Sequence, residues 1–226
     1  MKFPSMVLLT TSPVRDTEII LGAFERWGVD AAVPRLLGMF AIAVWDAATR
    51  SLSLVRDQLG IKPLFVYSKD GLVSFGSELK ALRAGPSFDT TIDIEGLSGF
   101  LRYLYVPAPR TIYRYALKLP PGHILTITDP GAPLPEPVAY WTAAEASRRG
   151  EEDPFSGSDE EAIVELDRLL SDAVRLQMQS DVPLGALLSG GIDSSTIVSM
   201  MQQSSSTPVE TFTIGFDANH YDESRH

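Results

Sequence analysis

A short run of glycines and serines holds the residue types in this sequence that are best suited to chemistry. It reads Leu187-Leu-Ser189-Gly190-Gly191-Ile-Asp193-Ser194-Ser195 and lies where an apolar run gives way to a helix-forming one. Glycine lacks a Cβ and adopts positive φ readily, so the backbone of such a turn can approach an anion closely. Backbone N–H groups at the helix start and the serine hydroxyls would donate to phosphate oxygens. The pattern therefore indicates a phosphate-binding loop.

Asp193 is the one acidic residue of this run. A carboxylate repels a bare phosphate, but beside phosphate oxygens it is a common ligand of Mg²⁺, so we expect Asp193 to bind that ion. The run is not a Walker A loop, because that motif has a lysine after its glycines. The alternative is a Ser/Gly-rich turn that only joins a strand to a helix. The strand–loop–helix context favours the phosphate loop over that alternative.

The elements around the loop must hold it at the end of a strand and the start of a helix. Val182–Leu188 is a continuous apolar run, typical of parallel sheets that are covered on both faces. Ser195–Gln203 is predicted to be helical and Val209–Phe216 to be the next strand. This β-loop-α-β order is typical of α/β domains. Ahead of it, Ser158-Asp-Glu-Glu161 fits a capping box that opens a helix. The apolar residues of that helix fall on one face: Ile163, Leu166, Leus 169 and 170, Ala173 and Val174.

The first part of the chain has a different pattern, in which strands are joined by short turns. A helix is predicted over residues 16–28, and consecutive hairpins indicate antiparallel sheet. The predicted strands are Gly38–Trp45, Leu52–Val55, Leu64–Tyr67 and Leu72–Phe75. From residue 89 to about 157 prolines recur, and beyond a helix at Ile94–Tyr103 we expect a connector between domains with loops and short strands.

Composition narrows the classes of function. The chain has 226 residues and a net charge of −10, which disfavours nucleic acid as a partner without excluding ATP. No apolar run approaches the roughly 20 residues of a membrane span, and the N-terminal stretch is a poor signal peptide, so we expect a cytoplasmic protein. There is no cysteine, which removes disulfides, thiolate zinc sites and thiol nucleophiles.

Several further segments carry a resemblance to a known family. The loop is similar to the pyrophosphate loop of enzymes that split ATP into AMP and pyrophosphate. The upstream segments resemble the asparagine synthetase (glutamine-hydrolysing) family in the same order. These segments are residues 16–18, 38–46, 56–64, 76–82, 105–112, 119–123, 140–141 and 180–183. Because glutaminase segments precede the pyrophosphate loop, the resemblance points to asparagine synthetases among the pyrophosphate-loop enzymes.

The resemblance implies an α+β domain followed by an α/β domain. Residues 1–88 would be the C-terminal part of a class II glutamine amidotransferase domain, a partial N-terminal-nucleophile glutaminase of αββα layers with antiparallel sheets. Residues 89–157 would be the connector. Residues 158–226 would begin an ATP-pyrophosphatase domain, Rossmann-like with a parallel sheet. Arg56, Asp57 and Lys62 are expected to form an ion network rather than to act in catalysis.

The family also implies roles for single residues. ATP and its pyrophosphate would contact Leu187, Ser189, Gly190, Gly191, Asp193, Ser194, Ser195 and, at the adenine, Ile214. Asp16 would hold the α-amino group of glutamine, and a helix N-cap is its alternative role. The implied reaction amidates aspartate with ammonia from glutamine and consumes ATP with Mg²⁺. Full-length relatives would be homo-oligomeric.

Two departures from the family pattern lead to further expectations. The family's glutaminase nucleophile is an N-terminal cysteine, which this sequence does not contain, so we assign no catalytic residue. The segments before Asp16 and the second ATP-contacting segment of the family are not found, so we expect a fragment. The remaining strands of the glutaminase sheet would then present unpaired edges, and the apolar run Met39–Val44 would favour aggregation once exposed.

Two other functions stay open at this point. A paralogue with the same machinery would act on another carboxylic acid, as in β-lactam or peptide-cyclising synthetases. A non-catalytic remnant would bind a nucleotide or a partner without turnover. Activity with free ammonia, which bypasses the glutaminase, distinguishes the remnant from the enzymes.

Overall fold

The structure is a computed structural model, and it describes residues 7–9, 14–180 and 182–215. The chain divides into two compact units, Met1–Glu152 and Asp153–His226. Each unit has its own hydrophobic clusters, so each is described by itself.

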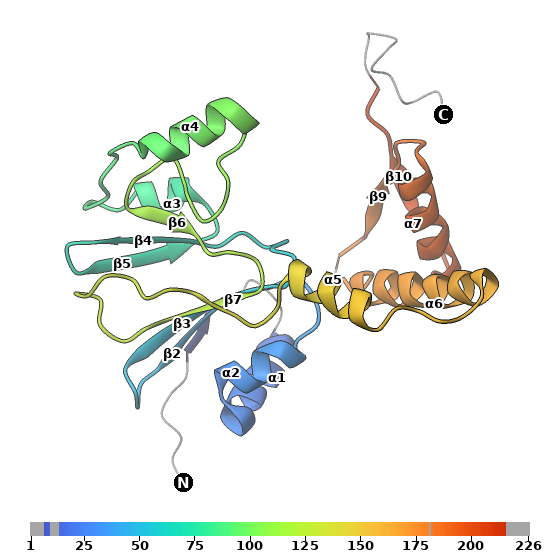
Figure 1. The fold of residues 1–226 in the computed structure, drawn as a ribbon, viewed down its shortest axis with the longest axis horizontal. Coiled ribbons are helices and arrows are strands. Elements are labelled where there is room, and N and C mark those ends of the chain that lie inside the picture. Colours follow the sequence, from blue (N-terminus) through green and yellow to red (C-terminus); the bar gives the residue numbers. More distant parts are fainter. Residues whose placement is uncertain (1–6, 10–13, 181, 216–226) are drawn as a thin grey trace. The chain divides into compact units, whose positions relative to one another are not determined.

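In the described residues, the larger sheet of the first unit has five antiparallel strands in the order β1-β2-β3-β7-β8, of which Figure 1 labels β2, β3 and β7. Its strands are β1 (Val7–Leu9), β2 (Ala41–Asp46), β3 (Ser51–Arg56), β7 (His123–Ile127) and β8 (Val138–Ala139). Strand β2 lies inside this sheet, because it pairs with β1 on one edge and with β3 on the other. The part of the run Met39–Val44 that forms β2 therefore has both of its edges paired, and the expected aggregation stays a prediction.

A second, three-stranded sheet lies against the first. It has the antiparallel order β5-β4-β6, with β4 (Phe65–Lys69) in the middle. The outer strands are β5 (Leu72–Gly76) and β6 (Ala116–Lys118). Leu54 of the first sheet and Val66 of the second belong to one buried cluster, and both have no exposed surface. The two sheets thus pack face to face around a common core.

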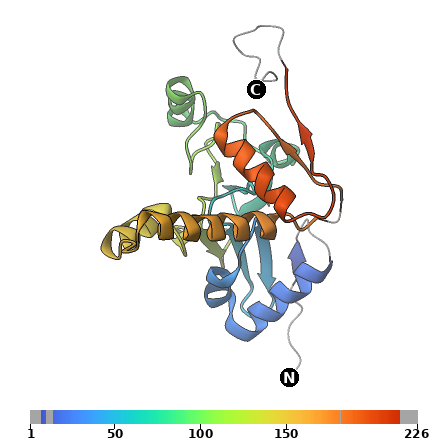
Figure 2. The same cartoon turned by 90° about the vertical axis from the view of Figure 1, so that its right-hand side faces the viewer.

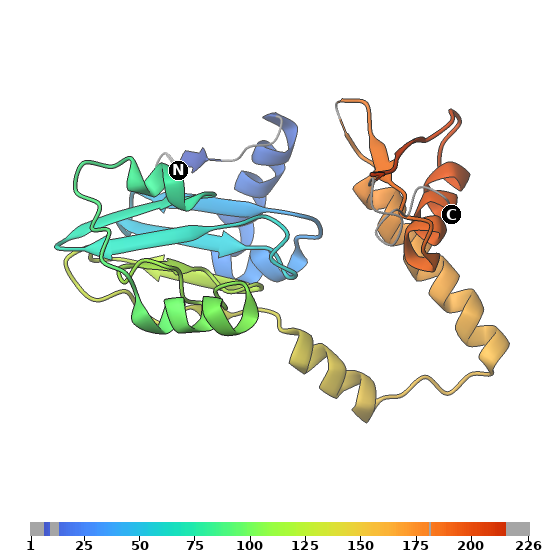
Figure 3. The ribbon, with the colours of Figure 1, turned by 90° about the horizontal axis from the view of Figure 1, so that it is seen from above.

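Helices cover the outer face of each sheet (Figures 1 and 3). Helices α1 (Val14–Trp27) and α2 (Val29–Ala32), with a short 3₁₀ turn at Val33–Arg35, pack through Phe24 on the outer face of the larger sheet. Helix α3 (Leu79–Arg83) packs beside β4 and β6 on the outer face of the smaller one, and helix α4 (Ile94–Tyr103) follows it. The order of layers is helix, sheet, sheet, helix, which agrees with the expected αββα arrangement. The apolar run of β2 does not alternate with polar residues because both of its faces are covered.

The proline-rich segment is not a simple connector. Residues 89–157 contain β6, β7, β8, α4 and α5 (Ala143–Glu152). Strand β7 pairs with β3, and β6 pairs with β4, so both sheets need this segment to complete them. The first compact unit accordingly runs to Glu152 rather than to residue 88. Prolines 120 and 121 stand just before β7, where they do not remove a ladder donor.

Within its described residues, the second unit contains two helices and a pair of strands, which Figure 2 shows from the side. Helix α6 (Asp159–Gln177) opens with the predicted capping box, in which Ser158 and Glu161 satisfy each other's backbone N–H groups. Strand β9 (Gly185–Leu187), helix α7 (Ile192–Gln203) and strand β10 (Glu210–Phe212) follow, and the two strands pair in parallel. The predicted β-loop-α-β order is confirmed, although the strands are shorter than expected and Phe216 lies outside the described residues.

The core of the second unit is small. Among the described residues of this unit, the buried ones are Val174 of α6 and Met200 and Met201 of α7. On the predicted apolar face of α6, Leu170 packs against this cluster, whereas Ile163 and Leu166 are more than half exposed. No helix in the described part of the chain has the length and apolar character that a membrane crossing requires.

Candidate functional site

The predicted phosphate loop lies between the end of β9 at Leu187 and the start of α7 at Ile192. Gly190 has a φ of 77°, a left-handed conformation that glycine adopts without strain. Gly191 is the N-cap of α7, in extended conformation, and no side chain caps the helix. The first-turn N–H groups of α7 therefore keep no side-chain partner at the cap, as a phosphate-binding turn requires.

Two serines hold the loop in shape. The hydroxyls of Ser189 and Ser194 lie 3.1 Å apart, and the Ser189 backbone N–H donates to the Ser194 Oγ at 3.3 Å. The Ser194 hydroxyl in turn donates to the Gly191 carbonyl at 3.2 Å. These bonds tie the two ends of the turn to each other. Ser195 is different: among the described residues its hydroxyl makes no hydrogen bond, and the side chain is exposed.

The neighbouring strand fixes the start of the loop. The Leu188 N–H donates to the Phe212 carbonyl at 2.9 Å, and the Thr213 hydroxyl donates to the Leu188 carbonyl at 2.7 Å. This role of Thr213 was not predicted from the sequence. The one feature that could have indicated it is a hydroxyl residue directly before the candidate Ile214. Leu187 and Ile214 are 72% and 63% exposed, so both side chains are accessible to a ligand.

Asp193 lies in the first turn of α7 with its side chain exposed. No group of three His, Cys, Asp or Glu residues that suits a metal ion occurs in the described residues. A single carboxylate nevertheless fits Mg²⁺ at a nucleotide, because this ion is usually held by one or two carboxylates together with phosphate oxygens and water. A single carboxylate therefore suits a metal ion that binds together with a phosphate ligand better than a metal ion bound by the protein alone.

Asp16 belongs to the first unit and is the third residue of α1. The structure therefore gathers the eight ATP-side candidates around one loop and its neighbouring strand, while Asp16 stands in the other unit. Its place inside α1 differs from the N-cap alternative, because an N-cap residue precedes the helix.

Arg56 and Asp57 bind backbone groups rather than each other, so the expected ion network is not found among the described residues. The Arg56 guanidinium donates to the carbonyls of Leu119, Gly60 and Lys62 at 2.7–2.9 Å. The buried Asp57 carboxylate accepts from the N–H groups of Ile61 and Lys62, both at 2.9 Å. Burial lowers the pKa of Arg56, and the nearby Asp57 opposes this shift. Both residues shape the loop after β3.

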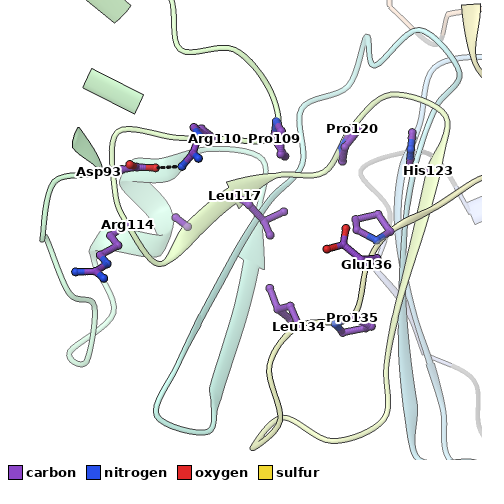
Figure 4. Close-up of a pocket in the computed structure, with 12 residues that line it drawn as sticks. Asp93, Pro109, Arg110, Arg114, Leu117, Pro120, His123, Leu134, Pro135 and Glu136 are labelled. Carbon is purple, nitrogen blue, oxygen red and sulfur yellow. Dashed lines mark hydrogen bonds and ion pairs between the residues drawn. The ribbon is translucent and has the colours of Figure 1, made fainter. Parts of the chain in front are cut away.

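A hollow of about 500 Å³ in the first unit contains none of the predicted site residues (Figure 4). Prolines from residues 109–137 form much of its lining, and the ion pair of Arg110 with Asp93, at 2.9 Å, lies on its wall. Arg110 also pairs with Glu95, so this cation is already balanced by two carboxylates. The hollow therefore adds nothing to the site at the loop.

Comparison with known proteins agrees with this division of the chain. Residues 8–141 match the family model of the glutamine amidotransferase domain, and residues 165–226 match that of asparagine synthase. The first match covers more than half of the chain, which therefore belongs to the glutamine amidotransferase domain family. The two matches in this order bear out the resemblance to asparagine synthetases.

Curated relatives point the same way. The chain is 33% identical to asparagine synthetase [glutamine-hydrolyzing] 1 of Bacillus subtilis over 208 residues, which cover 92% of this chain and 31% of the relative. It is 36% identical to a putative asparagine synthetase [glutamine-hydrolyzing] of Mycobacterium bovis, with the same two coverages. Amidase chyE of Penicillium rubens is 28% identical over 89% of this chain and 30% of its own length. The chain thus spans about a third of the length of these relatives.

Proposed function

We propose that this chain is part of a glutamine-dependent asparagine synthetase, in which the described loop binds the pyrophosphate of ATP. The reaction would activate aspartate with ATP, release pyrophosphate and displace AMP with ammonia from glutamine. The order of the two family matches and the geometry of the loop support this proposal.

The observation that carries the proposal is the glycine at position 191. Its φ of −73° suits any residue, and an added Cβ would meet only the Ser189 Oγ, at 3.5 Å. Neither the backbone nor internal packing therefore requires glycine there. A ligand that approaches the backbone closely would require it, and an oxygen of a phosphate is such a ligand.

The residues around the loop then take the following roles. The N–H groups of the α7 first turn and the exposed Ser195 hydroxyl donate to the pyrophosphate. Ser189 and Ser194 keep the turn closed, and Asp193 binds Mg²⁺ at the phosphates. Leu187 and Ile214 offer apolar surface to the adenine.

The first unit would be the glutamine amidotransferase part, a portion of an N-terminal-nucleophile glutaminase in which Asp16 holds the glutamine α-ammonium. Asparagine synthetases of this type use a cysteine nucleophile, and the sequence has none, so we expect the 226-residue chain to release no glutamate from glutamine. The second unit, from about residue 158, would begin the ATP domain. The proposal includes a cytoplasmic location and homo-oligomeric full-length relatives.

Calorimetry with Mg·ATP and Mg·pyrophosphate tests the loop. Asp193→Ala and Gly191→Ala should each weaken binding about tenfold, because one removes a metal ligand and the other blocks the close approach. Asp167→Ala is the control, since Asp167 lies exposed on α6 away from the loop and should bind like the parent. Equal affinities in all four proteins would reject the assignment.

A second candidate is a relative of this enzyme that amidates another carboxylic acid. The similarity to a protein named amidase supports it, because 89% of this chain aligns with that protein at 28% identity. ATP–pyrophosphate exchange with free ammonia separates the candidates. Dependence on aspartate supports the synthetase, dependence on a different acid supports the relative, and binding of ATP without exchange supports a non-catalytic role.

A further inference from the structure

A second hollow of the first unit lies on the outer face of the smaller sheet. Its volume is about 460 Å³, within the range of small-molecule sites. Phe65 of β4, Leu79 of α3 and Leu97 and Phe100 of α4 form one side of it. The rest of the lining consists of Tyr105, Val106, Thr111, Ile112 and Lys118 of β6. Nearly all of this lining is apolar.

Close backbone packing fixes the position of the elements that line this pocket. Gly96 is buried on α4, and an added Cβ there would lie 2.3 Å from the Thr111 carbonyl oxygen, so the helix is seated directly on the opposite wall. Leu104 ends α4 with a φ of 63°, which turns the chain so that Tyr105 and Val106 close one side. Phe100 and Tyr105 are 43% and 61% exposed and stand where solvent reaches the pocket.

Lys118 is the only ionisable amine or acid among the residues that line this pocket. Its Nζ donates to the carbonyl of Val106, which leaves two of its three donor positions for other partners. Of the ion pairs in the described residues, none includes Lys118. The charged group that acts on it is Arg56, also a cation, and burial together with Arg56 lowers the pKa of Lys118.

We propose that this pocket binds a small carboxylic acid with an apolar body, whose carboxylate accepts hydrogen bonds from the Lys118 ammonium. An ammonium that is partly buried without a carboxylate partner is unfavourable, and an anionic ligand would offset that cost. The apolar walls would take up the hydrocarbon part of the same ligand. A neutral apolar molecule would leave the Lys118 charge unbalanced, and a short polar acid would leave the walls uncovered.

This site is separate from the proposed function. The pocket lies on the outer face of the smaller sheet, whereas α1, which carries Asp16, packs on the outer face of the larger one. The phosphate loop belongs to the second unit. Failure of either proposal therefore leaves the other standing.

Titration of the ¹⁵N-labelled full chain with 4-phenylbutyrate tests the site, with the neutral 4-phenylbutyramide as the matched probe. The acid should bind about tenfold more tightly than the amide, since a hydrogen bond to a charged group adds that much. Amide shifts should cluster at Phe65, Leu79 and residues 97–118. Lys118→Met should erase the preference for the acid, while Lys80→Met, an exposed lysine of α3 outside the pocket, should keep it.

A second variant covers the case in which Lys118→Met fails to fold. Phe100→Ala removes an exposed wall residue and should weaken both probes equally, by about tenfold. Equal affinity of the parent for acid and amide overturns the proposal. So do shifts that map away from the pocket, and so does the absence of saturable binding up to about 10 mM of acid, a concentration well above the Kd of a weak specific site.

Discussion

Strands β2 and β9 are both apolar, yet they lie in very different surroundings. In β2 of the first unit, Ile42 and Val44 are 1% and 2% exposed, and both edges of the strand are paired. In β9 of the second unit, Leu187 is 72% exposed, and within the described residues the strand pairs only with β10. The difference shows that an apolar run determines that a strand forms, but that its burial depends on how many partners cover it.

The same contrast separates the two units as folded bodies. The first has buried clusters on both sides of its larger sheet, whereas the buried part of the second rests on Val174, Met200 and Met201. Because burial of apolar surface is the main favourable contribution to folding, we expect the first unit to be much the more stable. Four measurements can break or sharpen this comparison.

The largest effect is expected for truncation of a core leucine in the first unit. Leu54→Ala should lower the free energy of unfolding by about 2–5 kcal/mol, because the side chain is fully buried between the sheets. Leu187→Ala, the matched change in β9, should alter it by less than about 0.5 kcal/mol. Urea unfolding followed by circular dichroism measures both. Similar losses in the two variants would mean that Leu187 is buried in solution.

Glycine substitutions come next. Gly60 has a φ of 66°, and an added Cβ would lie 2.8 Å from Pro121 Cγ, so Gly60→Ala should cost about 1–2 kcal/mol or more. Gly191→Ala should leave stability nearly unchanged while it weakens ligand binding. Gly22→Ala is the control for helix propensity, since Gly22 lies in α1 with open space around it, and it should stabilise by about 0.5–1 kcal/mol. Thermal melts of the three variants give the order, and a stable Gly60→Ala protein would contradict it.

The capping box of α6 provides a smaller test within the second unit. Ser158→Ala removes the side-chain acceptor of the Glu161 N–H and should cost about 1 kcal/mol. Hydrogen exchange should show the loss in the amides of α6 and not in those of β2 and β3. Ser158→Asp, which keeps a capping oxygen, should restore protection. A loss spread evenly over both units would show that they unfold together.

The smallest effect concerns acid. The Lys69 ammonium, 2.5 Å away, and Thr91 lower the pKa of Asp89 from its usual value. Because the pKa of Asp89 is lower in the folded than in the unfolded protein, the ionised carboxylate stabilises the fold at a pH above the unfolded-state pKa of about 4. This stabilisation is lost as the pH falls from there through the folded-state pKa. Asp89→Asn should therefore lose less stability than the parent between pH 7 and about pH 3. Urea midpoints at both pH values measure this, with Asp167→Asn as the control. Equal acid sensitivity in the parent and Asp89→Asn would exclude the pair as its source.

Much of the local structure was predictable from the sequence, because local signals determine it. Helix 94–103 has the predicted bounds, the capping box at Ser158 forms, and turn residues mark both hairpins. The strand–loop–helix junction at residues 187–195 also forms where the glycines and serines predict it, while its role in phosphate binding stays a prediction.

Long-range pairing was the part that the sequence did not reveal. Short strands were expected in the proline-rich segment, but not that β6 and β7 complete the two sheets, because a proline count does not show that Pro120 and Pro121 stand outside the ladder that follows. Arg56, Asp57 and Lys62 suggested an ion network, yet Asp57 accepts from the nearby backbone N–H groups of Ile61 and Lys62, and Arg56 donates to carbonyls that include the distant Leu119. The residues that line the pocket at Lys118 come from four separate elements, so no single sequence motif predicts this pocket.

Because β7 pairs with β3 but is synthesised later, the larger sheet cannot be completed until the ribosome has made β7. Strand β3 ends at Arg56, and its edge stays open until His123–Ile127 has left the ribosome. At the usual 5–20 residues per second, the roughly 70 intervening residues take about 4–14 s to make. The Tyr140 hydroxyl, which donates to the Arg56 carbonyl, arrives later still. A nascent chain with the β2–β3 hairpin complete therefore waits for seconds with one strand edge unoccupied, the interval in which a chaperone that shields strand edges would act on it.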